Sequence, residues 1–292
     1  MANKVGKVVQ EFYNNTPFPD YDLARFNSIA DLKAAATSFA QVLDRSIPAT
    51  AKVIDVGTGT GQLSAYLSLK RNDVWGIDFS DSSLKKAEAL KKKLKLKTLT
   101  LKKVDILDIE QIKVIGTQFD YLICTGVLHH TGNAYQAFKN ILQLVKPGGY
   151  VAIGLYHKVG RIPLQIRRKM VKNLYANRED KRKEYLRMYI GDIDDPELER
   201  GVWNDQFVHP HETTHTVGEV LKWFKRNDVK YYQSVPTLKF SEDAELEIVG
   251  LWNKLNYGYP YFLVRNLVEL TWLWKIQKQG GHWVMFGRKN DS

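Results

Sequence analysis

The chain has 292 residues, of which 44% are hydrophobic, and a formal net charge of +11. This length predicts one large domain or a domain with additions, and the apolar fraction is sufficient for a packed core. The single cysteine, Cys124, excludes an internal disulfide and fits a reducing compartment. No apolar run follows the N-terminal lysines, and the most apolar late stretch, residues 259–274, is too short and too polar to span a bilayer. We therefore expect a cytoplasmic protein without a signal peptide.

The positive charge is concentrated in two segments. Residues 85–103 hold nine lysines against Glu88, and residues 158–187 hold eleven lysines and arginines against three acids. The rest of the chain is therefore acidic, so the protein is not basic throughout. In the first segment, three consecutive lysines, Lys91 to Lys93, form the C-terminal end of a helix predicted from Ser80, where the helix dipole favours cations. A solvated helix end is the favoured interpretation there.

The N-terminal region predicts two helices separated by a break. Residues 3–13 place valines and an aromatic side chain on one face, and Pro17 and Pro19 then end the helix. Residues 31–43 predict one amphipathic helix. The aromatic side chains around the prolines form either a packed arm or a lid over a binding site, and both interpretations stay open. These side chains are Phe12, Tyr13, Phe18 and Tyr21.

A glycine-rich turn follows the first predicted strand. Residues 52–56 are rich in β-branched side chains, as a buried parallel strand requires, and residues 62–69 have helical spacing. The turn between them contains Gly57, Gly59 and Gly61. Strand, glycine turn and helix together let a ligand approach bare backbone at a helix N-terminus. A dinucleotide fingerprint requires a small residue where this chain has Gln62, so a dinucleotide is not favoured.

The following strands end at polar groups. Residues 74–77 are closed by Asp78, and residues 99–104 are closed by Asp105. A strand over residues 119–124 leads into Thr125-Gly-Val-Leu-His-His130. A helix over residues 133–145, the turn Lys-Pro-Gly-Gly and a strand over residues 150–156 complete this part of the chain. Because ligands of open α/β sheets lie beyond the carboxyl ends of the strands, these polar groups are candidates for one site.

Asp-x-Gly-x-Gly-x-Gly, starting at Asp55, resembles the first motif of class I S-adenosylmethionine (SAM)-dependent methyltransferases, and the later strands follow at that family's spacing. The Leu-His-His and Lys-Pro-Gly-Gly motifs are similar to the branch that includes ubiquinone/menaquinone-biosynthesis methyltransferases. The resemblance covers about residues 50–157. It implies SAM as cofactor, with Asp78 on the ribose and Asp105 near the adenine. The cofactor-binding residues that it implies are Asp55, Gly57, Thr58, Gly59, Gly61, Asp78, Phe79, Asp105, Ile106, Thr125 and Gly126.

A basic insertion follows the fifth strand. Residues 161–175 carry apolar side chains every fourth residue between arginines and lysines, which predicts a basic amphipathic helix, and residues 179–189 predict a second one. We weigh three interpretations of residues 161–187: a cap packed on the core, which is favoured, a helix that binds an anionic membrane surface, and a platform for RNA.

An acidic loop at residues 194–197 leads to a histidine-rich run that ends at His215. The spacing of Asp205, His209, His211 and His215 matches no standard zinc pattern, so we expect no metal. Thr216 and Glu219 form a capping box for a helix over residues 217–226. The run resembles a stretch of a methyltransferase sub-group with an N-terminal Pro-Phe-Pro-x-Tyr arm, which matches residues 17–21 here. We expect the run and the arm to form the acceptor side of the site.

Methyl transfer requires positioning and, for a hydroxyl acceptor, removal of a proton. The candidate catalytic residues are His209, His211, His129 and Tyr13. A structural role for His129, packed against the following helix, is favoured over catalysis. His130 and His157 are further candidate bases, whereas His282 begins a strand and is expected to be structural.

The expected fold is α/β: a Rossmann-like, seven-stranded class I methyltransferase sheet with an N-terminal arm and two mainly helical insertions. The segments are the arm (1–48), the SAM-binding core (49–157), the basic insertion and His-rich loop (158–215), a core helix and strand six (216–236), an aromatic helical insertion (237–281), and strand seven with the tail (282–292).

The leading hypothesis for function is a SAM-dependent methyltransferase that acts on a small or lipid-like acceptor, with oxygen favoured. The alternatives are an RNA (tRNA) methyltransferase that uses the basic insertion and a non-catalytic SAM-binding protein. The sequence leaves the acceptor and the oligomeric state open.

Overall fold

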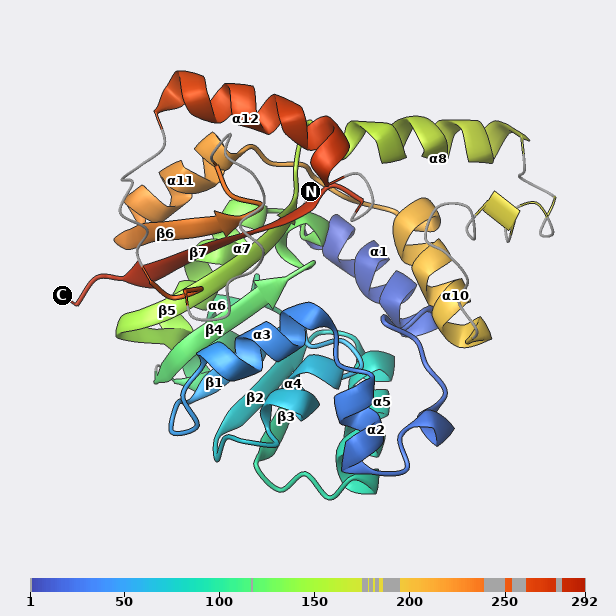
Figure 1. The fold of residues 1–292 in the computed structure, drawn as a ribbon. Coiled ribbons are helices and arrows are strands. Elements are labelled where there is room, and N and C mark those ends of the chain that lie inside the picture. The colour runs from blue at the N-terminus through green and yellow to red at the C-terminus, as the bar shows by residue number, and fades with distance from the viewer. Residues whose placement is uncertain are drawn as a thin grey trace.

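A seven-stranded sheet of order β3-β2-β1-β4-β5-β7-β6 forms the centre of the computed structural model (Figure 1). The structure describes residues 2–116, 118–174, 178, 181, 184–185, 195–238, 250–253, 261–276 and 280–291. The strands are β1 (Val53–Val56), β2 (Val74–Asp78), β3 (Leu99–Lys103), β4 (Phe119–Thr125), β5 (Val145–Tyr156), β6 (Val229–Val235) and β7 (His282–Lys289). The first five are parallel, and β7 is antiparallel to both of its neighbours. The expected fold class is confirmed.

Helices cover both faces of the sheet because successive side chains of a strand point to opposite faces. Val53 packs on the face covered by α3 (Ser38–Ser46), α4 (Gln62–Leu67) and α5 (Asp81–Lys93). Its neighbour Ile54 packs on the other face, which is covered by α6 (Ile109–Ile115), α7 (Ala134–Ile141), α11 (Val217–Arg226) and α12 (Phe262–Lys275). Central strands that are buried on both faces explain the continuous β-branched runs of the sequence.

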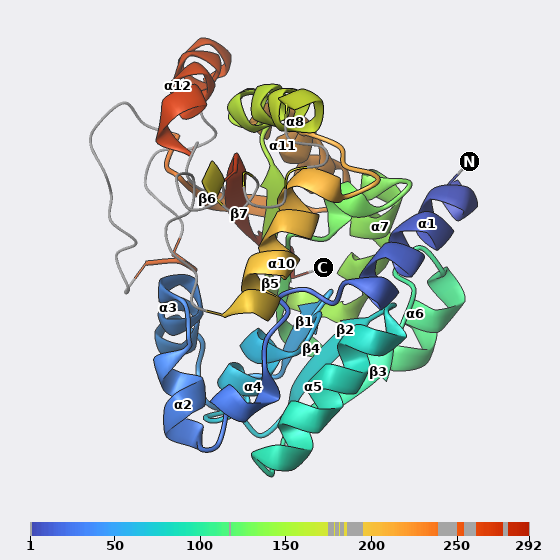
Figure 2. The ribbon, with the colours of Figure 1, turned by 90° about the vertical axis from the view of Figure 1, so that its right-hand side faces the viewer.

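Three of the remaining helices, α1 (Ala2–Asn15), α8 (Ile162–Leu174) and α10 (Pro196–Trp203), lie around the carboxyl ends of the strands. The short helix α2 (Ile29–Ala34) packs against α4 instead, with Leu32 in the same core cluster as Leu67. Both ribbon views show α1 and α10 beside each other, and α8 and α12 together at one end of the molecule (Figures 1 and 2). Segments from the start, the middle and the end of the chain therefore meet near one edge of the sheet.

Two expected helices have other bounds in the structure, and one expected loop is a helix. The single helix expected over residues 31–43 is two helices, because the Thr37 side chain caps a new helix by accepting a hydrogen bond from the Ala40 amide at 3.2 Å. The helix expected up to residue 145 ends at Ile141, and a 3-10 turn leads into β5, which starts at Val145.

The segment expected to be a loop from residue 194 is the helix α10, which continues as a π-helical turn, Asn204–Val208. Asp195 caps α10, and Pro196 provides its first residue, where a missing amide costs nothing. The helix expected over residues 179–189 falls almost entirely outside the described residues.

Candidate active site

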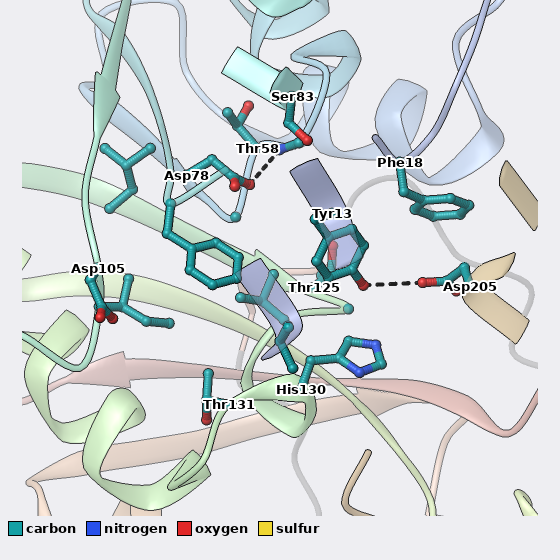
Figure 3. Close-up of a pocket in the computed structure, with 18 of the residues that line it drawn as sticks. Tyr13, Phe18, Thr58, Asp78, Ser83, Asp105, Thr125, His130, Thr131 and Asp205 are labelled. Carbon is teal, nitrogen blue, oxygen red and sulfur yellow. Dashed lines mark hydrogen bonds between the residues drawn. The ribbon is translucent and has the colours of Figure 1, made fainter. Parts of the chain in front are cut away.

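A cavity of about 470 Å³ opens at the carboxyl ends of the parallel strands (Figure 3). It is lined by the glycine turn after β1, the ends of β2, β3 and β4, and the N-terminal arm. The expected residues among its lining are Gly57, Thr58, Gly59, Asp78, Phe79, Asp105, Ile106, Thr125, Gly126 and Tyr13. Two expected cofactor residues, Asp55 and Gly61, lie outside the set that lines it.

Asp55 shapes the glycine turn from behind the cavity. Its carboxylate is 4% exposed and accepts a hydrogen bond from Thr58 Oγ1 at 2.8 Å, and that hydroxyl is also 2.7 Å from Ser64 Oγ. Burial raises the pKa of Asp55 to about 7. Gly61 adopts a left-handed conformation, with φ of 82°, as the residue before α4, and a side chain there would strike Ala87.

Asp78, at the end of β2, is a partly exposed acid in the cavity wall. One carboxylate oxygen accepts the Gly59 amide at 2.9 Å, and the other accepts the Ser80 amide at 2.8 Å. Burial raises the pKa of this carboxyl group. Two backbone bonds leave further lone pairs on both oxygens, so Asp78 can accept hydroxyl groups of a ligand. An apolar slot with Phe79, Ile106 and Leu107 among its walls lies beside it, and Asp105 stands at the end of the next strand.

The N-terminal arm is fastened across the glycine turn. Thr60 Oγ1 donates to the Pro19 carbonyl at 2.7 Å, and the Tyr21 hydroxyl donates to the Thr60 carbonyl at 2.8 Å. A side chain at Gly59 would strike the Phe18 carbonyl, so only glycine permits this close approach. The helix α1 is fixed further along, where Gln10 Nε2 donates to the Phe79 carbonyl at 2.8 Å. The arm is therefore packed against the core and also forms part of the cavity wall. Both interpretations of its aromatic residues, as a packed arm and as a cover over a binding site, apply to it.

A cluster of polar and aromatic side chains closes the end of the cavity away from Asp78. The Tyr13 hydroxyl donates to Asp205 Oδ1 at 3.2 Å, and Gln206 Nε2 donates to Asp205 Oδ2 at 2.7 Å (Figure 3). The Tyr156 hydroxyl lies 3.5 Å from the same oxygen. Burial and the Asp205 charge raise the pKa of Tyr13 well above its ordinary value, so this phenol stays protonated.

His130 completes this end of the cavity. Its Nδ1 lies 2.9 Å from the His211 carbonyl oxygen. A carbonyl accepts only, so Nδ1 carries the proton, and Nε2 of the neutral ring has the lone pair. Burial lowers the pKa of His130, which keeps the ring neutral at pH 7. The ring lies on the same side of the cavity as Tyr13 and Asp205 (Figure 3).

The three histidines predicted as catalytic lie behind this wall. His129 is fully buried, with its ring centroid 3.9 Å from that of Tyr156, and burial lowers its pKa well below the ordinary value. Neither of its ring nitrogens has a hydrogen-bond partner within the described part of the chain. The ring centroids of His209 and His130 are 3.8 Å apart, and the His211 carbonyl oxygen orients the His130 ring.

The other histidines have separate partners. His215 Nδ1 lies 2.9 Å from a Glu219 oxygen, and His157 Nε2 lies 2.9 Å from a Glu269 oxygen. Within the described residues, no group of three His, Cys, Asp or Glu side chains is arranged to hold a metal ion.

A buried ion pair between Arg161, the residue before α8, and Glu212 supports the polar wall. Arg161 is fully buried and binds Glu212 through two nitrogens, at 3.1 and 2.7 Å, and its guanidinium carbon lies 3.5 Å from the Tyr156 ring centroid. It also donates to Gln206 Oε1 at 2.9 Å.

The sequence analysis did not predict four residues that line the cavity or hold the arm: Gln10, Tyr156, Gln206 and His282. A signal was present only for Tyr156 and His282, which stand at the ends of strands beside the site.

Comparison with known proteins gives a family. A model of the methyltransferase domain matches residues 48–226, more than half of the chain. Ubiquinone biosynthesis O-methyltransferases of Dechloromonas aromatica and Rickettsia prowazekii are 32% and 31% identical over 40% and 37% of this chain, and over 49% and 40% of their own length. The chain thus spans about half or less of the length of these curated relatives. PKMT2 from Rickettsia typhi has a TM-score of 0.59 at 14% identity, over 87% of this chain and 53% of that one, a likeness in fold.

A seven-stranded sheet with a glycine turn after β1 and acids at the ends of β2 and β3 defines the class I SAM-dependent methyltransferases. The chain belongs to the methyltransferase-domain family. The expected family and its cofactor, SAM, are thereby confirmed.

The residues of the cavity fit this cofactor. A carboxylate with free lone pairs suits ribose hydroxyls, and the apolar side chains beside Asp105 suit an adenine ring. Gly57 and Gly59 line the cavity and have no side chain to cover their backbone. SAM would be held by these residues and by the apolar walls from Phe79 to Leu107. When bound, SAM supplies an electrophilic methyl group on a sulfonium.

Proposed function

We propose that this protein transfers a methyl group from SAM to a hydroxyl oxygen of a small or lipid-like acceptor, with His130 as the general base. The observation that carries the proposal is the His130 ring in the cavity wall, with Nδ1 donating to the His211 carbonyl at 2.9 Å. This bond directs the basic nitrogen, Nε2, away from the backbone. A lowered pKa keeps the ring unprotonated and so able to accept a proton.

In the proposed reaction the acceptor hydroxyl attacks the methyl carbon in line. The O–H proton passes to Nε2 of His130, a C–O bond forms, and the C–S bond breaks. Tyr13 stays protonated and donates to Asp205, so it serves in orientation rather than as a base. Asp205 and Gln206 offer an acceptor and an amide group with which a second polar group of the substrate could be held.

The arm excludes water from the displacement in this proposal. Phe18 and Pro19 line the cavity, and their backbone is fixed to the glycine turn through the 2.7 Å bond from Thr60. A dry site strengthens the polar contacts of the acceptor. The Tyr13 contact to Asp205 joins the arm to the acceptor end, as the hypothesis of a site shared by the arm and the His-rich run requires.

The test uses SAM labelled in its methyl group and extracts of metabolites and lipids, with and without nuclease. Label in a nuclease-resistant small molecule, with an O-methyl group identified by mass spectrometry and NMR, is the expected result. Label that disappears with nuclease treatment would favour the RNA alternative. SAM binding without transfer to any extract would favour the non-catalytic alternative.

A further inference from the structure

The helix α12 exposes a large apolar face. Its inner side chains, Val268 and Trp272, are buried in the core. On the outer side, Leu263 is 73% and Trp274 is 72% exposed. The apolar and aromatic residues exposed on and next to α12 are Tyr261, Phe262, Leu263, Val264, Leu267, Leu270 and Trp274. Single apolar residues are commonly exposed on protein surfaces, but an apolar helix face of this size is not. A set of this size therefore indicates an interaction site.

The helix α8 exposes the apolar stripe that its sequence predicts. Ile162, Ile166 and Met170 recur every fourth residue, and they are 40, 55 and 54% exposed. The buried contacts of this helix come instead from Leu164 and Val171. The favoured interpretation of this helix as a cap packed on the core therefore accounts for one of its faces and leaves the predicted stripe in solvent.

The two helices are neighbours in the fold. Both ribbon views show α8 and α12 at the same end of the molecule (Figures 1 and 2). Gly160, just before α8, lies so close to Ile276, just after α12, that a side chain there would strike it. We call the exposed apolar side chains of α8 and α12 with Lys169 and Lys275 the α8–α12 surface.

The charge of this surface is positive. Lys169 and Lys275 are exposed at its margins. The only acid in the two helices, Glu269, is buried and lies 3.2 Å from Arg265 and 2.9 Å from His157. Apolar and aromatic side chains beside lysines, without an exposed acid, are the composition of helices that lie in the interface of an anionic membrane.

We propose that the α8–α12 surface docks this protein on an anionic lipid bilayer. A second copy of the chain is a poorer occupant, because a two-fold interface would bring the lysines of this surface against themselves. None of the helices in the described part of the chain is both long and apolar enough to cross a bilayer.

The surface is coupled to the acceptor end of the cavity. Arg168 of α8 donates from Nε to the Gln206 carbonyl, and its Nη1 lies 2.9 Å from Glu212. A bilayer against α8 would therefore lie over the wall that contains Gln206. The docking also narrows the class of acceptor in the proposed function: the acceptor would be an amphiphile taken from the membrane surface. Only this statement about the acceptor rests on the proposed function.

The test is sedimentation of the full chain with vesicles of phosphatidylcholine alone and with equimolar phosphatidylcholine and phosphatidylglycerol. We expect binding to the anionic vesicles that weakens as salt rises. Leu267→Glu and Lys169→Glu should each lower the partition coefficient by about tenfold. The matched control is Val114→Glu, since Val114 is a 74% exposed apolar residue of α6, away from this surface. Its binding should equal that of the unaltered protein.

Three results would overturn the proposal. These are absence of binding to either vesicle, a dimer in sedimentation velocity that Leu267→Glu converts to a monomer without any vesicle binding, and binding of single-stranded RNA in place of vesicles. Calorimetry with SAM is run in parallel without vesicles. A protein that binds vesicles but not SAM contradicts the proposed function alone, and one that binds SAM but not vesicles contradicts the docking alone.

Discussion

The Tyr13 hydroxyl donates a hydrogen bond to Asp205 at 3.2 Å, between residues that are 192 positions apart in the chain. This bond joins the N-terminal arm to the turn after α10, directly over the cavity at the ends of the parallel strands. In the proposed function, the acceptor end of the site thus joins these two segments to His130 and Tyr156, which lie at the ends of β4 and β5. It is where variants should separate catalysis from SAM binding.

Asp78→Ala should weaken SAM binding at least about tenfold, a loss of roughly 1.4 kcal/mol, because we expect the carboxylate to accept the ribose hydroxyls and because it binds the Gly59 amide at 2.9 Å. Calorimetry measures the effect. Asp81→Ala is the control, since this acid begins the next helix with its side chain 64% exposed. An unchanged affinity in Asp78→Ala would contradict the role assigned to Asp78.

His130→Gln should lower turnover by about 10² to 10⁴, the usual contribution of a general base, while SAM affinity stays near that of the unaltered protein. Glutamine keeps a polar side chain of similar reach but cannot accept a proton at neutral pH. Single-turnover kinetics with labelled SAM measure the rate. Full activity of this variant would mean that the acceptor needs no base or that another group supplies it.

His209→Asn and His211→Asn should have different effects. The His209 ring packs 3.8 Å from the His130 ring, so its loss should loosen His130 and lower turnover strongly. His211 orients His130 through its backbone carbonyl, which asparagine retains, so this variant should lower turnover less. Equal losses in the two variants, with normal SAM binding, would indicate that both side chains touch the acceptor.

The activity should depend on pH through His130. Burial lowers its pKa below the usual 6.5, so the basic form predominates from neutral pH upward and activity falls only in acid. The acid limb of the kcat/KM profile should therefore lie below pH 6.5 and be absent in the residual activity of His130→Gln. A limb above pH 6.5 would exclude His130 as its source.

Buried histidines should also make stability depend on pH. His282 has a pKa of about 4 in the folded protein, lowered by burial, against about 6.5 in the unfolded chain. Between these values the unfolded chain binds more protons, so stability falls as pH drops from about 6.5 to 4, by up to about 3 kcal/mol for this residue. Urea titrations should show a shallower fall in His282→Gln, and an equal slope would refute this assignment.

The sequence by itself determined the sheet and the cofactor end of the site. Burial on both faces of the sheet favours continuous β-branched runs, and the close approach of the arm backbone requires glycine at position 59, so both leave a local signature in the sequence. Asp78 and Asp105 could be placed because they directly close strands whose ends meet at one edge of the sheet.

The sequence led us to expect that the arm and the His-rich run meet, but only the tertiary structure decided which of their side chains line the cavity and which helix faces lie in solvent. Asp205 and Tyr13 meet through the packing of two distant helical segments, and no periodicity along the chain encodes which of several neighbouring histidines reaches a cavity. His129 and His130 are adjacent in sequence, yet one is sealed behind Tyr156 and the other lines the site, because the 3-10 turn that contains them directs successive side chains differently. The apolar stripe of α8 was visible in the sequence, but only the fold shows that it lies in solvent, since periodicity gives the faces of a helix and packing decides which face is covered.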